Sequence, residues 1–181
     1  MRFQKIKKIK VTASTNADAF VLAKQGEPEG SVIVAECQTA GRGRYHRKWI
    51  SEPGGLYFSI ILRPAIKASL APQLIFVTAL AVKEAVESYL GHPTQLKWPN
   101  DVMIQQKKVC GILTEVETKN DAVNFIVVGV GLNVNQAFFP KKISKAAISL
   151  FQVIKKNLFL DEVLDKILQR FDHWYDLYLK A

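Results

Sequence analysis

A run of strand-like segments joined by short connections fills residues 94–135 and limits the folds open to this chain. The segments read QLKW, DVMIQ, VCGILTEVE and VNFIVVGVGLNV, and most are apolar and rich in β-branched residues. Gln105-Gln106-Lys107 has the length that joins two strands of a hairpin. Neighbouring parallel strands need crossovers of a dozen residues or more, so consecutive hairpins argue against a doubly wound parallel sheet.

Helical patterns flank this strand region on both sides. Ser14, Thr15 and Asn16 precede an apolar-periodic segment at about 16–25 that ends at Gly26, which is typical of a capped helix with a glycine stop. Further strands are expected at 5–12, 31–37 and 56–63, a long apolar helix at 72–90, and another helix from about residue 160 onwards. Together these elements predict an α/β (α+β) fold: a mixed, mainly antiparallel sheet with helices on one face, in a single domain spanning residues 1–181.

Composition narrows the class of protein and its compartment. The chain has 181 residues, of which 49% are hydrophobic and 23% charged, as in a globular domain and not a disordered chain. No apolar run reaches the length of a membrane span, and the basic N-terminus lacks the apolar segment of a secretory signal. We therefore expect a cytoplasmic protein with no membrane partner. Cys37 and Cys110 lie in apolar strands and are expected to be free thiols.

The net charge of +9 predicts an anionic partner, which the charge alone leaves open between a nucleic acid, a nucleotide and an acidic protein. Most of the lysines fit a solvated surface. The segment Gly41–Lys48, GRGRYHRK, is different because four cations gather there without a counter-charge. Glycines alternate with arginines, so the backbone can bend while guanidinium groups converge on phosphate or carboxylate oxygens. We interpret it as a flexible loop that orders around an anion.

A second polar group is Lys97-Trp98-Pro99-Asn100-Asp101, followed by the lysines of the segment at 107–113. A carboxylate and an amide beside a lysine-bearing hairpin have the donors to hold Mg²⁺ and phosphate together. Plain turn chemistry after the proline is the alternative interpretation. Gly129-Val130-Gly131 resembles half of a dinucleotide fingerprint but lacks the third glycine and the following helix, and no P-loop motif is present. It indicates a strand that another group approaches closely, or simply a bulge.

Four motifs in one order make the chain resemble the biotin–protein ligase family: AECQTAGRGR with RKW, KWPNDV, KKVCGILTE and VVGVGLNVN. The resemblance runs from about residue 10 to the end and implies a fold related to class II aminoacyl-tRNA synthetases. It also implies a biotin–[acetyl-CoA-carboxylase] ligase that forms biotinyl-AMP from the substrates biotin and ATP, with Mg²⁺. A lysine of a biotin carrier protein would then take the biotinyl group.

The resemblance assigns roles to individual residues. Lys108, Arg42 and Arg44 would be catalytic, and Arg44, Arg47, Asn100 and Asp101 would contact ATP phosphates, with Asp101 as the Mg²⁺ ligand. The set that would bind biotin or its adenylate is Ser14, Thr15, Asn16, Gln38, Gly41, Arg42, Gly43, Arg44, Trp49, Lys108, Gly111, Gly131 and Asn133. Packing in the core is the alternative role for Trp49.

Some features depart from the family pattern. Tyr45-His46 replaces a more flexible pair in the loop, and Cys110 stands where alanine is common, which predicts a slightly altered pocket. The chain shows neither the N-terminal helix-turn-helix nor the C-terminal β-barrel of many members, so we expect the catalytic domain alone and no DNA partner. The family often dimerises, which makes a homodimer possible. The alternatives are a lipoate or octanoate ligase or transferase of the same fold, and a basic nucleic-acid-binding module.

Overall fold

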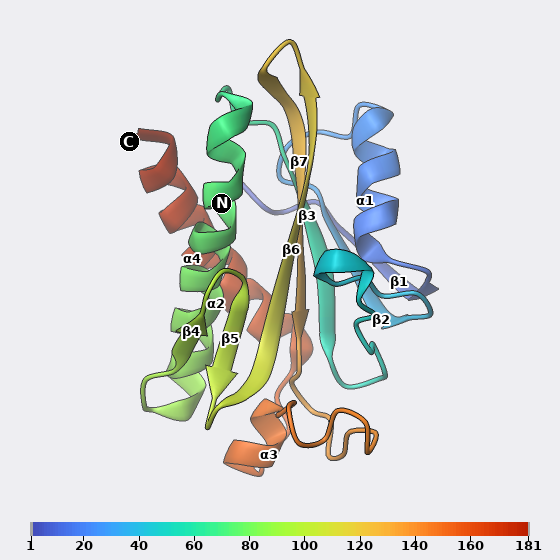
Figure 1. Ribbon diagram of the computed structural model, residues 1–181, viewed down its shortest axis with the longest axis vertical. Coiled ribbons are helices and arrows are strands. Elements are labelled where there is room, and N and C mark those ends of the chain that lie inside the picture. The colour runs from blue at the N-terminus through green and yellow to red at the C-terminus, as the bar shows by residue number, and fades with distance from the viewer. Residues whose placement is uncertain (1, 181) are drawn as a thin grey trace.

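The computed structural model describes residues 2–180, and at His46 the backbone alone. Its centre is a seven-stranded sheet in the order β1-β2-β3-β7-β6-β5-β4 (Figure 1). Every neighbouring pair is antiparallel except β1 and β2, which run parallel. The strands are β1 (Ile6–Thr12), β2 (Val32–Gln38), β3 (Leu56–Leu62), β4 (Gln95–Lys97), β5 (Asp101–Ile104), β6 (Lys107–Lys119) and β7 (Ala122–Leu132). The mixed, mainly antiparallel sheet expected from the sequence is confirmed.

The hairpins have the tight turns that the sequence predicts. Gln105 and Gln106 join β5 to β6, and both have positive φ values, 49° and 62°. Asn120 and Asp121 join β6 to β7 in the same way, with φ values of 51° and 63°. Two successive residues with positive φ match the twist of the flanking strands, so each pair closes a two-residue hairpin.

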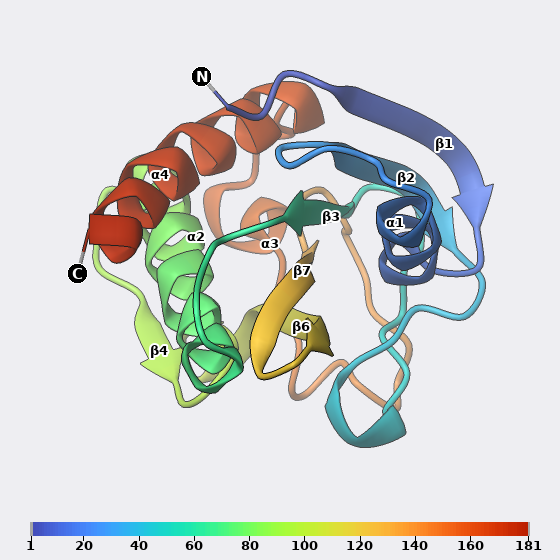
Figure 2. The ribbon, with the colours of Figure 1, turned by 90° about the horizontal axis from the view of Figure 1, so that it is seen from above.

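Helices cover both faces of the sheet, which differs from the expectation of one covered face (Figure 2). Helix α1 (Thr15–Lys24) packs its alanines on Ile61 and Val127 on one face. Three helices pack on the other face and contribute side chains to the larger core: α2 (Leu74–Leu90), α3 (Leu150–Ile154) and α4 (Leu160–Lys180). The reason lies in β3, LYFSIIL, whose seven residues are all buried. An unbroken apolar strand has no face for water and needs cover on both sides.

The short helix α3 was not expected from the sequence. Its N-terminus is a capping box in which the Ser149 hydroxyl accepts from the Gln152 backbone N–H and the Gln152 side chain reaches back to the Ser149 backbone N–H. The Ser-x-x-Gln spacing is therefore the sequence pattern that indicates this helix.

One helical stretch meets the length and composition of a membrane span, contrary to the expectation that no apolar run is long enough. It is Ala68–Leu90, a 3₁₀ turn followed by α2, and half of its most apolar window is buried within the domain. Leu74, Val82 and Val86 of this helix belong to the larger core. Helix α2 is therefore apolar because it packs against the sheet and forms part of the core.

Candidate active site

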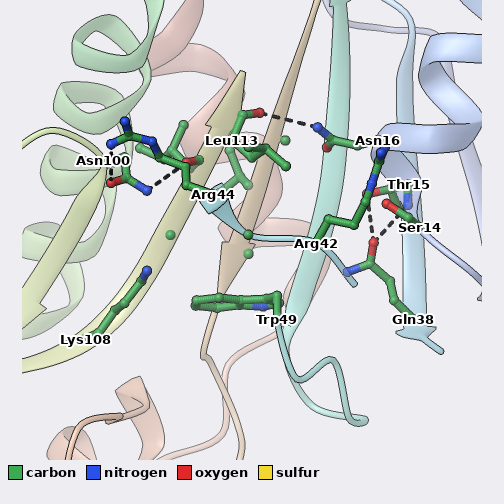
Figure 3. Close-up of a pocket in the computed structure, with 16 residues that line it drawn as sticks. Ser14, Thr15, Asn16, Gln38, Arg42, Arg44, Trp49, Asn100, Lys108 and Leu113 are labelled. Carbon is green, nitrogen blue, oxygen red and sulfur yellow. Dashed lines mark hydrogen bonds between the residues drawn. The ribbon is translucent and has the colours of Figure 1, made fainter. Parts of the chain in front are cut away.

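Two adjoining cavities flank the 41–48 loop: the inner one lies between the loop, α1, β6 and β7, and the outer one between the loop, the starts of β5 and β6, and the segment at 139–147. The inner cavity is narrow, with a volume of about 40 Å³, and the outer one measures about 630 Å³. Five residues line both cavities and form the wall between them: Gly43, Arg44, Trp49, Asn100 and Lys108. Figure 3 shows this wall, with the Trp49 ring between Lys108 on one side and the α1 residues on the other.

The structure gathers most of the residues singled out from the sequence around the inner cavity. Its lining contains Ser14, Thr15, Asn16, Gln38, Arg42, Gly43, Arg44, Trp49, Asn100, Lys108, Gly111 and Gly131. Arg47, Asp101 and Asn133 line the outer cavity instead. Gly41 lines neither; it is buried, and a Cβ there would meet the Trp49 carbonyl oxygen and the Ser51 hydroxyl. Cys110 belongs to the larger core, so it does not shape the pocket wall.

Hydrogen bonds among buried polar side chains form the floor of the inner cavity. Ser59 Oγ lies 2.7 Å from Asn16 Oδ1 and 2.8 Å from Thr15 Oγ1. An amide oxygen only accepts, so Ser59 donates to Asn16, and Thr15 is left to donate to Ser59 or to Gln38. Gln38 Oε1 accepts from the Thr15 backbone N–H at 2.8 Å, which orients its amide group. The network therefore fixes both amides before any ligand arrives.

Two polar groups of this floor remain available to a ligand. Ser14 occupies the N-cap position of α1, yet its side chain makes no capping hydrogen bond. Gln38 Nε2 donates one hydrogen to Ser51 Oγ at 2.7 Å, and an amide nitrogen carries two. A small neutral ligand group with its own donors and acceptors would pair with such a surface.

The 41–48 loop folds back on itself beside this floor. The Trp49 backbone N–H donates to the Gly41 carbonyl at 2.9 Å, and the Gly43 N–H donates to the Arg47 carbonyl at 2.7 Å. Tyr45 adopts a left-handed conformation with φ 54° and ψ 41°, which a side chain with a Cβ rarely takes. Its ring lies under the Arg44 guanidinium, 4.9 Å from carbon to centroid, and its hydroxyl accepts from Arg44 Nη2 at 3.1 Å.

Trp49 fills the space above two glycines of the sheet. A Cβ on Gly131 would overlap its indole, and a Cβ on Gly111 would lie 2.9 Å from its ring and from Lys108 Nζ. The two glycines are thus needed for the close approach of this side chain. The indole N–H is buried and has no hydrogen-bond partner among the described residues. A buried unpaired donor costs roughly 1–3 kcal/mol, which a ligand acceptor would recover.

The wall and the outer cavity are strongly cationic. Lys108 Nζ lies 2.6 Å from Asp101 Oδ1, a close ion pair whose angles do not make a directed hydrogen bond, and 5.1 Å from the Trp49 ring centroid. Arg44 donates to Asn100 Oδ1 at 3.4 Å. The outer cavity is lined by the basic side chains of Arg44, Arg47, Lys48, Lys108 and Lys142. Asp101 is the single carboxylate of that lining, so the cavity favours a polyanion.

Sequence reasoning missed several residues of the site. Ser51 and Ser59 orient the floor, and Glu115 contacts both Asn16 and Arg42. The close approach expected at Gly129 and Gly131 is confirmed, by Asn16 at the first and by Trp49 at the second. A serine inside the otherwise apolar strand β3 was the available indication, because a buried hydroxyl needs a partner. No group of three or more His, Cys, Asp or Glu side chains that could hold a metal ion occurs among residues 2–180.

Comparison with known proteins places the chain in a family. Residues 8–133 match the model of the biotin/lipoate A/B protein ligase family, and the chain belongs to that family. It is 41% identical over 172 residues to the bifunctional ligase/repressor BirA of Bacillus subtilis. The matched region covers 93% of this chain and 53% of that protein. It is 40% identical over 151 residues to the biotin–[acetyl-CoA-carboxylase] ligase of Mycobacterium tuberculosis, covering 78% of this chain and 53% of that protein.

A solved structure has the same fold. The biotin protein ligase from Aquifex aeolicus in complex with biotin and ATP superposes with a TM-score of 0.85 and 38% identity, covering 99% of this chain and 73% of that one. The chain spans about half the length of the curated relatives it matches.

Proposed function

We propose that this chain is a biotin–protein ligase, which activates biotin as biotinyl-AMP and transfers it to a lysine of a biotin carrier protein. One observation carries the proposal: Arg44, Asn100 and Lys108 lie in the wall between an inner cavity with a neutral polar floor and a cationic outer cavity. A carboxylate held from the inner side and a phosphate held from the outer side would meet at these donors. The Aquifex relative was solved with both biotin and ATP.

The inner cavity suits the ureido ring of biotin, which presents one carbonyl acceptor and two N–H donors. The Ser14 hydroxyl and the second Gln38 amide hydrogen are the groups left unpaired for it. Its volume of about 40 Å³ is far below the usual range for small-molecule sites, so biotin would need Trp49 or the loop to move. We infer that the loop and the indole open for biotin and then close over it.

The outer cavity suits ATP. Its volume of about 630 Å³ lies within the usual range for small-molecule sites. Phe139, Ile143 and Ala146 supply an apolar surface on which a nucleobase can pack. Asp101 would hold Mg²⁺ bound to the phosphates, because Mg²⁺ sites often use one or two carboxylates together with substrate oxygens. Lys108 already pairs with Asp101, so Mg²⁺ would compete with Lys108 for this carboxylate.

The chemistry needs no protein nucleophile. A biotin carboxylate oxygen forms a bond to the α-phosphorus of ATP, and the bond to pyrophosphate breaks. Negative charge grows on the α-phosphoryl oxygens, where Lys108 and Arg44 would stabilise it. The amine of the carrier lysine then attacks the acyl carbon and loses a proton, and AMP leaves. The closed loop would keep water from the adenylate between the two steps.

The partner in this proposal is the carrier domain of a carboxylase subunit, and the compartment is the cytoplasm. The Mycobacterium tuberculosis relative is named for the acetyl-CoA carboxylase that it modifies. A homodimer and the absence of a DNA partner stay predictions.

Exchange of radioactive pyrophosphate into ATP tests the first step. We expect exchange with biotin and none with lipoate or octanoate. Exchange with lipoate alone would move the chain to the other activity of its family, and no exchange beside tight, salt-sensitive DNA binding would favour a nucleic-acid module. A carrier domain and its Lys→Arg variant then test transfer, which we expect with the first only.

A further inference from the structure

One carboxylate oxygen joins the floor of the inner cavity to the 41–48 loop. Glu115 lies on β6, and its Oε2 accepts from Asn16 Nδ2 at 2.8 Å. The same oxygen accepts from Arg42 Nη2 at 3.1 Å, which is both a hydrogen bond and an ion pair. Glu115 lines neither cavity, so it would touch no ligand itself.

The Asn16 end of this contact is rigid. Asn16 is buried, its oxygen accepts from Ser59 at 2.7 Å, and its amide nitrogen also lies 3.4 Å from the Leu113 carbonyl. Gly129 lies so close that a Cβ would occupy the place of the Asn16 oxygen. Asn16 can therefore hold only one orientation, with its N–H₂ group directed at Glu115.

The Arg42 end belongs to the loop and is less buried. The Arg42 side chain is 44% exposed and that of Glu115 is 28% exposed. Arg42 pairs with Lys48 in an isolated bridge across the loop, so its position follows that of the whole segment. Loop opening must break the contact with Glu115, whereas the contact of Glu115 with Asn16 can persist.

We propose that Glu115 is a positioning residue that latches the 41–48 loop to the cavity floor through Arg42. This inference rests on the proposed function, because it assigns the latch to retention of the acyl adenylate. The Glu115 carboxylate also cancels the Arg42 charge beside the floor, which leaves Arg44 as the loop cation directed at the junction of the cavities. Two arginines separated by one glycine thus have different tasks.

Limited trypsin digestion tests the latch without any substrate. Trypsin cuts after Arg44, Arg47 and Lys48, and mass spectrometry identifies those bonds. In Glu115→Gln the side chain can still accept from Asn16 but no longer attracts Arg42 by charge, and we expect these bonds to be cut about two- to fivefold faster, the range of a partly exposed ion pair. Added salt should speed cutting in the unmodified protein and have little effect on the variant.

Glu117→Gln is the matched control. Glu117 lies two residues along β6, hence on the same face of the strand, and pairs with Lys24 of α1 at 3.6 Å, away from the loop. We expect loop cutting in this variant at the unmodified rate. Arg42→Gln should equal Glu115→Gln, and the double variant should add nothing further, because both changes remove one interaction. Additive effects, or unchanged cutting in Glu115→Gln, would overturn the latch.

Release of preformed biotinyl-AMP, followed after dilution, tests what the latch does. We expect Glu115→Gln to release it two- to fivefold faster, with that excess disappearing at high salt. Faster loop cutting with unchanged release would refute a role in retention. If the unmodified protein forms no biotin-dependent adenylate, the proposed function fails, while the trypsin result still decides whether Glu115 holds the loop.

Discussion

Replacing Lys108 by alanine is the most direct perturbation of the proposed chemistry. Its ammonium stands in the wall between the cavities, where the biotin carboxylate and the α-phosphate would meet. Loss of one preorganised donor to a developing charge costs about 10²–10³-fold in rate, or roughly 2.7–4 kcal/mol. We expect biotin-dependent pyrophosphate exchange to fall by about this factor.

The structure limits how much of that loss can come from unfolding. The ion pair with Asp101 has side chains that are 30% and 22% exposed, and such pairs contribute up to about 1 kcal/mol. For a domain of this size that corresponds to at most about 4 °C in Tm. Thermal unfolding of Lys108→Ala should therefore change little. Lys107→Ala is the control, because Lys107 directly precedes Lys108 on β6 and lines neither cavity.

Asp101 provides a second check on the same variant. With Lys108 removed, the Asp101 carboxylate loses its counter-charge and repels the phosphates of ATP. If that repulsion is its main effect, adding Asp101→Asn to Lys108→Ala should recover part of the exchange rate. If Asp101 holds Mg²⁺, the double variant should be slower still. Exchange at the unmodified rate in Lys108→Ala alone would refute the placement of Lys108 in the reaction.

Two further variants and one chemical modification test other parts of the structure. Gly129→Ala places a methyl group on the Asn16 side-chain oxygen, and we expect the Kd for biotin in calorimetry to rise about tenfold or more, a loss of about 1.4 kcal/mol; an unchanged Kd would remove this floor from the site. Tyr45→Gly relieves a left-handed conformation costing about 1–2 kcal/mol but adds unfolded-chain entropy of about 0.5–1 kcal/mol. The Tm of this variant should thus change little, while biotinyl-AMP should leave it faster than the unmodified protein. Release at the unmodified rate would show that the Tyr45 ring does not hold Arg44 in place. Burial raises the pKa of both thiols, but Cys110 is fully buried and Cys37 only half-buried, so a thiol reagent at pH 8 should modify Cys37 alone until the domain unfolds; two reactive thiols in the native protein would contradict this.

The elements of the fold could be predicted because their determinants are local. Apolar runs, a glycine after α1 and two-residue turns lie within the segments that they define. The order of the strands could not be predicted in this way. β3 pairs with β7, some seventy positions further on, and β1 pairs in parallel with β2 across the whole of α1. Such pairings depend on how the whole sheet buries its two faces, and neither strand's own sequence shows which strand will be its partner.

The candidate site shows the same division. The glycine-spaced arginines, KWPND and Lys108 were recognisable in the sequence by their composition, and the fold brings Arg44, Asn100 and Lys108 to one wall. Ser59 is the one polar residue inside an otherwise apolar strand, and Glu115 is one of several polar residues of β6, so their contacts with Asn16 become apparent only in the folded structure. The sequence left two roles possible for Trp49, packing in the core and contact with a ligand. Its position over Gly111 and Gly131 places it in the cavity.

The distribution of charge determines how a ligand can lie across the two cavities. In the inner one, Gln38 is held by neutral partners, and the Glu115 carboxylate that accepts from Asn16 is paired with Arg42, so little free charge faces the floor. A charged group buried there would lose its hydration without a counter-ion, which is costly. In the wall and the outer cavity, by contrast, five basic side chains face one carboxylate, that of Asp101. Under the proposed function, a ligand with one neutral polar end and one carboxylate would therefore enter in a single direction, which would bring its carboxylate to Arg44 and Lys108 and hence to the phosphates of ATP.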